Sequence, residues 1–317
     1  MQKAEKGAIS PQAALVAVDH DVRTKIDQAT ERLKKFQNLG LIKSDEIVGR
    51  TVLDWECGDG SFAAALLLHG AKKVIGIDTW LNAEQAKQNY EAFAGSLDFQ
   101  RSSVFDFLEN SPSFANSFDA AFTCNVTEHL PMLYKQIEFL SKTLKKGAPF
   151  VISHHNYFHA IGHHDFMFLA STPKGLQVRA PACWESDEKC AASEDFRNRE
   201  HKRRPWMWSA EIDNRRNPDD CSKCPYYKRA RPWAHLIYAD DFNDMYPRGF
   251  SSEKDGSTLN KVTPFQLRQA AIEADFSIDF EQRDRSPAEP PAELVDSGYF
   301  TTIDLQTFMY RIRCIKR

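Results

Sequence analysis

The sequence has no uninterrupted apolar run that approaches the roughly 20 residues needed to span a bilayer. Residues 1–10 also lack the apolar core of a secretory signal peptide. The net charge of −3 provides no general attraction to nucleic acid, so any such affinity would have to be local. Seven cysteines, an odd number in a chain without a signal core, are typical of a reducing compartment rather than of a disulfide framework. We therefore expect a cytoplasmic protein with no membrane span.

The most informative stretch is residues 51–60, TVLDWECGDG. It begins as a buried strand that ends at Asp54, breaks into a glycine-containing turn, and continues as an apolar helix over residues 61–69. Strand, glycine turn and helix form the first unit of nucleotide-binding α/β sheets, whose ligands lie over the carboxyl ends of the strands. Glycine is needed in such a turn because a side chain would hold the ligand away from the backbone.

A second strand, residues 73–78, ends in Asp78, which is placed to accept hydrogen bonds from a ribose diol. The patterns VLDxxCGxG at 52–60 and VIGID at 74–78 resemble the S-adenosylmethionine (SAM) site of class I methyltransferases. Three later segments match further signatures of that family: FD at 118–119, NVTEHL at 125–130 and LKKG at 144–147. The resemblance covers about residues 45–156 and resumes at about 263–317.

The sequence departs from this family at Glu56, where the family usually has glycine. Glu56 either pairs with the ammonium group of the cofactor through a charge-assisted hydrogen bond, or crowds the site and repels the cofactor carboxylate. A dinucleotide dehydrogenase would share the strand and the turn. It usually carries a third glycine inside the helix, where this chain has Ala63 or a neighbouring apolar residue. The motifs together favour SAM binding.

The resemblance implies an α/β fold with a doubly wound, mostly parallel seven-stranded sheet, a C-terminal antiparallel hairpin and a large insertion after strand five. We expect an N-terminal helical segment at 1–50, a SAM-binding methyltransferase domain formed by 51–156 and 263–317, and an inserted acceptor-binding or cap region at 157–262. The N-terminal segment has one apolar stripe of an amphipathic helix. We expect this helix either only to pack on the sheet edge or also to cover the cofactor. The stripe consists of Val22, Ile26, Ala29, Leu33 and Phe36.

Local patterns predict the remaining elements. They are a helix at 81–94, strands at 98–104, 118–126 and 149–153, a helix from about Pro131 to Gly147, and another helix from about Thr263. Two alternating segments, 276–280 and 310–314, are predicted to be antiparallel strands with one solvated face, on which the arginines of the second segment lie. The Pro-rich link between them is long for a hairpin loop, and long ordered loops tend to be functional lids.

The resemblance also implies which residues hold the cofactor. Asp78 would hold the ribose diol, and Gly58 and Gly60 would present backbone amides to the methionine carboxylate. Asp54 would hold the turn and attract the ammonium group. Three residues at the ends of later strands would contact the adenine or lie near the sulfonium: Ser103, Val104 and Asn125.

Histidines are concentrated after the fourth and fifth strands, since six of the ten lie between residues 129 and 164. This density indicates an acceptor site, in which histidine serves either as a general base or as a ligand of a divalent metal that holds vicinal hydroxyls. The candidate catalytic residues are Glu128, His129 and His155. The candidate substrate contacts beside them are His154, Asn156, Tyr157, His163 and His164.

The insertion combines aromatic rings with positive charge. It holds four of the six tryptophans, and residues 197–231 contain eleven Lys or Arg against five acids. Such surfaces suit sugar rings, phosphates, carboxylates or stacked bases, and Arg204 and Trp206 are candidate substrate contacts. The alternative is a capping subdomain with its own core. Four cysteines in the insertion are either free or ligands of a structural zinc ion: Cys183, Cys190, Cys221 and Cys224.

These features together predict a SAM-dependent methyltransferase that methylates a hydroxyl group of a small molecule or glycan, sugar-like or anionic in character. An RNA (tRNA) methyltransferase is the alternative enzyme, supported by the basic and aromatic run in the insertion. A protein that binds SAM without catalysis is the alternative outside enzymes, and Glu56 is the reason to consider it.

Overall fold

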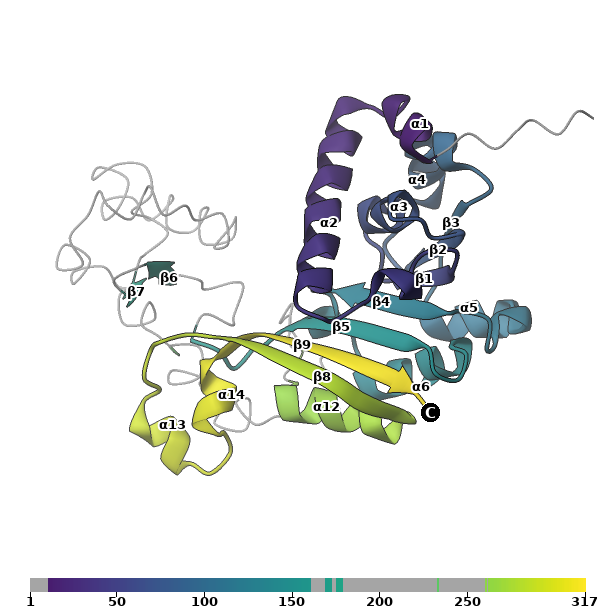
Figure 1. Cartoon of the computed structure of the whole chain (residues 1–317). Coiled ribbons are helices and arrows are strands. Elements are labelled where there is room, and N and C mark those ends of the chain that lie inside the picture. The colour runs from purple at the N-terminus through teal and green to yellow at the C-terminus, as the bar shows by residue number, and fades with distance from the viewer. Residues whose placement is uncertain (1–10, 161–168, 173–174, 179–232, 234–259, 261) are drawn as a thin grey trace, which may run out of the picture.

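The computed structural model describes residues 11–160, 169–172, 175–178, 233, 260 and 262–317. Its centre is a seven-stranded sheet in the order β3-β2-β1-β4-β5-β9-β8 (Figure 1). The strands are β1 Thr51–Trp55, β2 Lys73–Asp78, β3 Leu97–Arg101, β4 Ala120–Cys124, β5 Pro149–His155, β8 Phe276–Arg285 and β9 Thr307–Lys316. The first five are parallel to one another, and β9 runs antiparallel to both β5 and β8. This confirms the predicted mostly parallel sheet with a C-terminal antiparallel hairpin.

Helices cover both faces of this sheet. They are α1 Pro11–Val16, α2 His20–Asn38, α3 Ser61–Leu68, α4 Ala83–Asn89, α5 Val104–Asn110, α6 Leu133–Thr143, α12 Pro264–Glu273, α13 Ala292–Asp296 and α14 Thr302–Gln306. Short 3-10 helices lie at Ser44–Glu46, Glu91–Phe93, Pro112–Phe114 and Thr127–His129. A separate two-stranded hairpin joins β6 Leu169–Thr172 to β7 Gly175–Val178.

Alternate residues of the strands β1, β2, β4 and β5 enter two different hydrophobic cores, one on each face of the sheet. Val52 joins the core formed with α2 and α3, whereas its neighbour Leu53 joins the core formed with α5, α6 and α12. Strand order reverses between β1 and β4, so the carboxyl ends of these two strands flank the crevice where ligands of such sheets bind.

Helix α2 buries most of the apolar stripe seen in the sequence. Ile26, Ala29, Leu33 and Phe36 are all buried, and they pack in the same core as α3. Asp19 caps the helix by accepting a hydrogen bond from the amide of Asp21 at 2.8 Å. The helix therefore stands beside the strand–turn–helix unit that begins the sheet (Figure 1).

Several predicted boundaries were wrong. The predicted strand 98–104 ends at Arg101, because Ser103 caps α5 and Val104 is already helical. The helix expected from Pro131 begins at Leu133, because Met132 has a left-handed backbone with φ 48°. The fifth strand is longer than predicted and includes His154 and His155.

The prediction that arginines of the last strand lie on a solvated face was also wrong. Arg311 and Arg313 are only 6% and 4% exposed. Arg313 donates hydrogen bonds to Glu46 at 2.6 Å and to Asp279 at 2.7 Å. Strand β9 lies between β5 and β8, and Leu41, which follows α2, also lies against Arg313, so the positive charge is buried with carboxylate partners.

The Pro-rich link between β8 and β9 contains α13 and α14. Leu294, Phe300 and Leu305 of this link form a small core with the segment that follows β5. Phe158 lies 4.9 Å from the Phe300 ring, and Trp233, which is 1% exposed, belongs to the same core. The link is thus packed against the segment that follows β5.

Candidate cofactor and acceptor site

The turn after β1 holds its shape through two glycines. The amide of Cys57 donates to the carbonyl of Ile77 at 3.1 Å, and the amide of Gly60 donates to the carbonyl of Cys57 at 3.0 Å. Gly60 has φ 84°, and a Cβ there would lie 2.4 Å from Cζ of Phe99. Gly58 has φ 57°, but a Cβ there would meet no atom within 4 Å. The space beside Gly58 is therefore open to a ligand, whereas Gly60 is required by packing. The two amides that were predicted to face the methionine carboxylate both donate within the protein, that of Gly58 to Asp78 and that of Gly60 to Cys57.

Asp78 connects this turn to the end of β2. One carboxylate oxygen accepts the amide of Gly58 at 2.9 Å, and the other accepts the amide of Trp80 at 2.6 Å. The carboxylate is thus fixed in orientation while the indole of Trp80 is 91% exposed beside it. Trp80 was not predicted from the sequence, in which an aromatic residue two positions after the strand-ending acid was the available signal.

Two further carboxyl groups, those of Asp54 and Glu56, lie in the same site and are buried. Oδ2 of Asp54 and Oε1 of Glu56 have no hydrogen-bond partner. Burial, reinforced by the charge of Asp78, raises the pKa of Asp54 and that of Glu56 to about 8 each. Glu56 also has a left-handed backbone, with φ 58°. Three acids therefore meet at the ends of β1 and β2, and two of them have an unmet acceptor.

These residues fit SAM. Buried oxygens without donors suit a ligand that carries an ammonium group and a sulfonium. The open backbone at Gly58 leaves room for the amino acid end, and the fixed carboxylate of Asp78 can accept bonds from a ribose diol.

Helix α2 brings positive charge to this edge. Lys25 Nζ lies 3.1 Å from Oδ2 of Asp59 in the glycine turn. Arg32, two helical turns further on, lowers the pKa of both Asp54 and Cys124, against the stronger effect of burial. Neither residue was predicted from the sequence, although their spacing of seven places them on one side of the helix.

The predicted adenine contacts occupy the start of α5. The hydroxyl of Ser103 accepts the amide of Asp106 at 3.1 Å and donates to the Asp106 carboxylate at 2.7 Å. Ser103 is therefore a helix N-cap. Val104 is fully buried in the core shared with α6.

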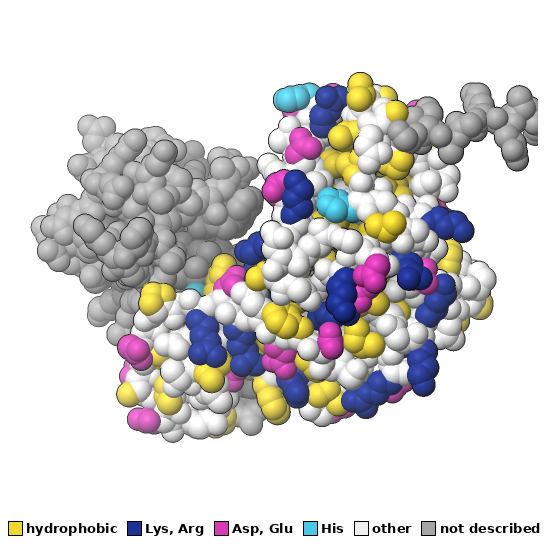
Figure 2. All heavy atoms as spheres, in the orientation of Figure 1, with side chains coloured by type: hydrophobic (Ala, Val, Ile, Leu, Met, Phe, Trp, Pro, Cys, Tyr) yellow, Lys and Arg dark blue, Asp and Glu magenta, His cyan; other side chains and the backbone are white. Residues whose placement is uncertain are grey.

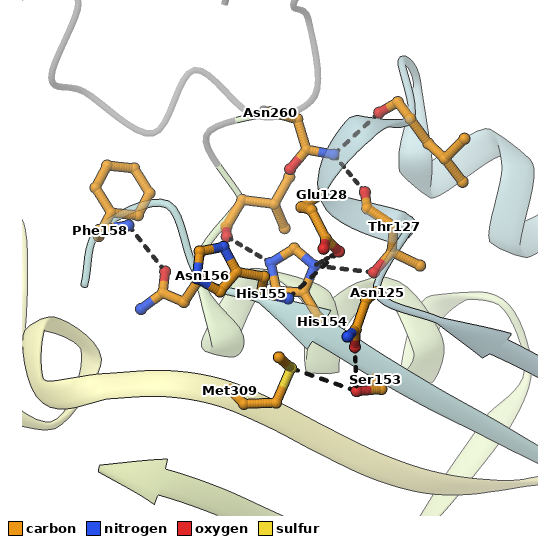
Figure 3. Close-up of polar contacts among 12 residues, drawn as sticks. Asn125, Thr127, Glu128, Ser153, His154, His155, Asn156, Phe158, Asn260 and Met309 are labelled. Atoms are coloured by element: carbon orange, nitrogen blue, oxygen red, sulfur yellow. Dashed lines mark hydrogen bonds and ion pairs between the residues drawn. The ribbon is translucent and has the colours of Figure 1, made fainter. Parts of the chain in front are cut away.

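On the acceptor side, Glu128 lies in the 3-10 helix Thr127–His129, directly after β4 (Figure 3). It is 1% exposed, and Oε2 accepts the backbone amide of His155 at 3.3 Å. The same oxygen lies 3.9 Å from Nδ1 of His154. Burial raises the pKa of Glu128 to about 8, so the carboxyl group can exchange a proton near neutral pH.

His154 is fully buried, and both of its ring nitrogens are engaged within the protein (Figure 3). Nε2 lies 3.1 Å from the carbonyl of Val262, which can only accept, so Nε2 carries the proton. Nδ1 then accepts the hydroxyl of Thr127 at 2.9 Å. Burial lowers the pKa of His154 to about 4, which keeps the ring neutral. The predicted substrate contact His154 thus joins β5 to two loops.

Asn260 is hydrogen-bonded to the loop that carries Glu128 (Figure 3). Its Nδ2 donates to the carbonyls of Thr127 at 2.6 Å and of Leu130 at 3.0 Å. Its backbone amide donates to the carbonyl of Glu128 at 2.5 Å. The sequence analysis did not select Asn260, because it lies 132 positions after Glu128 in a segment with no regular pattern.

The other predicted acceptor residues have different surroundings. His129 is exposed at the end of its 3-10 helix, and the buried ring of His155 packs edge-on at 4.8 Å from Phe308. Asn156 is fully buried: Nδ2 donates to the carbonyls of Asp304 and Thr307. Tyr157 packs edge-on against Phe158 at 5.3 Å.

Asn125 is exposed, has φ 57°, and accepts the hydroxyl of Ser153 at 2.7 Å (Figure 3). This residue directly follows β4, three positions before Glu128. The structure therefore brings together Asn125, Glu128, His154 and His155 from two adjacent parallel strands.

The remaining predicted residues lie outside the described part of the chain: His163, His164, Arg204, Trp206 and the zinc candidates Cys183, Cys190, Cys221 and Cys224. Among the described residues, no three His, Cys, Asp or Glu side chains are arranged to hold a metal ion. In the same described ranges, no helix has the length and apolar character that crossing a membrane requires.

Comparisons with known proteins agree with this geometry. A family model described as a methyltransferase domain matches residues 18–236. A ubiquinone biosynthesis O-methyltransferase of Actinobacillus pleuropneumoniae is 33% identical over 91 residues, 28% of this chain and 38% of that protein. A tRNA U34 carboxymethyltransferase of Methylococcus capsulatus is 32% identical over 106 residues, 33% of this chain and 32% of that protein. The chain thus spans about a third of the length of these curated relatives.

Among solved structures, a SAM-dependent methyltransferase of Mesorhizobium loti is 14% identical with a TM-score of 0.48, over 92% of this chain and 100% of that chain. The family model, by contrast, matches the sequence itself over more than half of its length. The chain therefore belongs to the methyltransferase-domain family of SAM-dependent methyltransferases.

Proposed function

We propose that the protein transfers the methyl group of SAM to a hydroxyl oxygen of a small molecule, with Glu128 as the proton acceptor. The observation that carries this proposal is the buried carboxyl group of Glu128 with a pKa of about 8, placed directly after β4 on the edge where the carboxyl cluster lies. An attacking hydroxyl must lose its proton, and a group that titrates near neutral pH is suited to receive it.

Bound SAM supplies an electrophilic methyl group, so the protein mainly has to orient the acceptor and exclude water. Asp54, Glu56 and Asp78 hold the cofactor on one side. On the other side, the bonds of His154 and Asn260 fix the loop that carries Glu128. The backbone amide of His155 donates to Glu128 and orients its carboxyl group, and His129 is the next residue of the same loop.

The names of the relatives support oxygen as the methylated atom, since the ubiquinone biosynthesis enzymes are O-methyltransferases. A sugar-like, anionic or glycan acceptor was expected from the histidines and from the basic, aromatic insertion, most of which lies outside the described residues. We therefore propose the broader class, a small hydroxylated molecule, and treat sugars as one arm of the test.

An RNA acceptor is the second candidate, because one relative acts on tRNA by its name. On the face drawn in Figure 2, the described Lys and Arg side chains are interspersed with Asp and Glu rather than gathered in one patch. Phosphate contacts give RNA binding a steep salt dependence, which separates the two candidates.

The test is transfer of isotopically labelled methyl from SAM to panels of phenols, catechols, sugars and tRNA, with the wild type and Glu128→Gln. We expect labelled O-methyl product from a small molecule, with a turnover that rises between pH 6.5 and 8.5 as Glu128 ionises. Glu128→Gln should lower kcat by roughly a hundredfold or more and remove this pH dependence.

The matched control is Glu109→Gln, which changes an exposed glutamate of α5 and should leave kcat unchanged. The affinity of Glu128→Gln for S-adenosylhomocysteine should stay within about twofold of the wild type, because Glu128 lies away from the carboxyl cluster. Full turnover of Glu128→Gln with an unchanged pH profile would contradict its role. Label found only in tRNA would replace the small-molecule acceptor, and failure of the wild type to bind SAM would overturn the proposal.

A further inference from the structure

Glu56 combines two features that folding alone does not explain. Its backbone is left-handed, with φ 58°, a conformation that is unfavourable for residues other than glycine, asparagine and aspartate. Its side chain is only 6% exposed, and Oε1 has no hydrogen-bond partner. A buried carboxyl oxygen without a donor is costly, so the position calls for an additional group that donates to it.

The two neighbouring acids differ in this respect. Both oxygens of Asp78 accept backbone amides, from Gly58 and from Trp80. Asp54, 2% exposed, resembles Glu56, because its Oδ2 has no partner. By geometry, one oxygen of Asp54 and one of Glu56 therefore remain without a donor. The Thr79 amide and the Trp55 indole lie near enough to Glu56 to lower its pKa, but burial outweighs them.

Other ionisable groups surround this pair. The neighbouring positive charges come from α2, where Lys25 is paired with Asp59 and Arg32 acts on Asp54. The remaining titratable groups that face the pair are Asp59 and Cys57 in the turn, Tyr90 after α4 and Cys124 at the end of β4. The acids raise the pKa of Cys57 and of Tyr90 further, beyond the effect of burial, so both groups stay neutral.

We propose that Glu56 binds the ammonium group of the amino acid end of the cofactor, and that the Asp54–Glu56 pair releases a proton to solvent as the ammonium arrives. This rests on the proposed function, since it requires SAM as the ligand. An ammonium group has three N–H donors and no acceptor, which matches two carboxyl oxygens without donors. In the empty site the pair holds protons instead of a cation.

The pKa of about 8 for each acid agrees with this exchange, because both are then mostly protonated at pH 7 in the absence of a cation. A cation favours the charged form of a neighbouring carboxyl group and therefore displaces the proton. Ligands that lack the ammonium group should bind without this exchange.

The test uses two stable ligands that share adenine and ribose. S-Adenosylhomocysteine has the amino acid end, and 5′-methylthioadenosine lacks it. Calorimetric titrations at pH 7 in two buffers of different ionisation enthalpy measure the protons released. We expect release of about one proton with S-adenosylhomocysteine and none with 5′-methylthioadenosine. From pH 6.0 to 7.5, affinity for S-adenosylhomocysteine should rise up to roughly twentyfold, and affinity for 5′-methylthioadenosine should not change.

Glu56→Gln keeps the shape of the side chain and removes its charge. It should lower the affinity for S-adenosylhomocysteine by about tenfold or more and lower the proton release by about half or more. The affinity for 5′-methylthioadenosine should stay within about twofold of the wild type. Glu56→Gly should behave in the same way, and it guards against misfolding because glycine tolerates the left-handed backbone. Glu109→Gln is the matched control and should match the wild type in all three measurements.

Unchanged or tighter binding of S-adenosylhomocysteine by both Glu56 variants, or equal proton release with both ligands, would overturn this inference while leaving the proposed function in place. If neither ligand bound the wild type, the proposed function would fail together with the inference.

Discussion

The two halves of the sheet's carboxyl edge treat their buried polar groups differently. At the ends of β1 and β2, Asp54 and Glu56 keep carboxyl oxygens without partners. At the ends of β4 and β5, His154 and Asn156 are fully buried and hydrogen-bonded to distant parts of the chain. Because buried polar atoms normally find partners, we expect a ligand to complete Asp54 and Glu56, whereas the protein itself completes His154 and Asn156.

This difference indicates where each kind of mutation will act. Substitutions among the unpartnered acids should change ligand binding more than folding, since the native contacts they remove are few. Substitutions among the bonded residues of β5 should change folding first, because each leaves several buried groups unsatisfied. Glu128, the proposed proton acceptor, lies between these extremes, with one amide partner and a backbone held by Asn260.

The largest effect is expected for Asn156→Ala. Its side chain donates to the carbonyls of Asp304 and Thr307 at 2.7 and 2.9 Å, and accepts the amide of Phe158 at 3.1 Å. Removing these bonds should lower the free energy of unfolding by about 3 kcal/mol, measured by urea denaturation. Asn110→Ala, at the exposed end of α5, should change it by less than about 0.5 kcal/mol. A loss below about 1 kcal/mol for Asn156→Ala would remove the distinction drawn between the two halves.

The glycine turn allows effects on ligand binding and on folding to be compared at two nearby positions, Gly58 and Gly60. Gly60→Ala places a Cβ 2.4 Å from the Phe99 ring at φ 84°, so it should lower the free energy of unfolding by about 2–3 kcal/mol. Gly58→Ala meets no atom within 4 Å, so its cost should be only about 1 kcal/mol of backbone strain.

Gly58→Ala should nevertheless have the larger effect on ligand binding when the two variants are compared as folded proteins. It should lower the affinity for S-adenosylhomocysteine by about tenfold or more, because the new methyl group occupies the space where the ligand approaches the backbone. Thermal unfolding and calorimetric titration of both variants measure the two effects. Normal ligand affinity of Gly58→Ala would show that the turn does not contact the cofactor.

Much of the cofactor side could be predicted from local patterns, because its residues are neighbours in the sequence. Strand, turn and acid lie within 28 residues, from Thr51 to Asp78, and the structure places the predicted Gly58 and Asp78 in direct contact. Glu56 was recognised as unusual because the resembled family usually has glycine at this position. Its left-handed backbone and unpartnered oxygen required the fold, since both depend on how the turn packs against β2.

The acceptor side was less predictable because its contacts join distant segments. A histidine-rich run after a strand indicated a site, but it did not show that His154 would donate to Val262, 108 residues later. Arg313 was expected in solvent for the same reason: its partners Glu46 and Asp279 come from two other parts of the chain. Alternation reveals which residues share a face, and only the tertiary structure shows what covers that face.

The smallest expected effect concerns the ligand-free protein and its stability as pH changes. The pKa of Glu56 is about 8 in the folded state and 4.5 without burial, so the unfolded state loses its proton first as pH rises. Stability of the empty wild type should therefore fall between about pH 5 and pH 8, and Asp54 and Glu128 act in the same direction. Glu56→Gly should make this fall less steep and should raise the free energy of unfolding by about 1 kcal/mol at pH 8.

Chemical denaturation at pH 5.5, 7 and 8.5, with and without S-adenosylhomocysteine, measures the effect. The ligand should stabilise the wild type more at high pH than at low pH, since its ammonium group replaces the protons that the acids lose. The difference should be smaller in Glu56→Gly, which has lost one of the acids. Equal pH dependence of the two empty proteins would mean that Glu56 is ionised and satisfied without a ligand, and the contrast between the two halves of the edge would then rest on Asp54 alone.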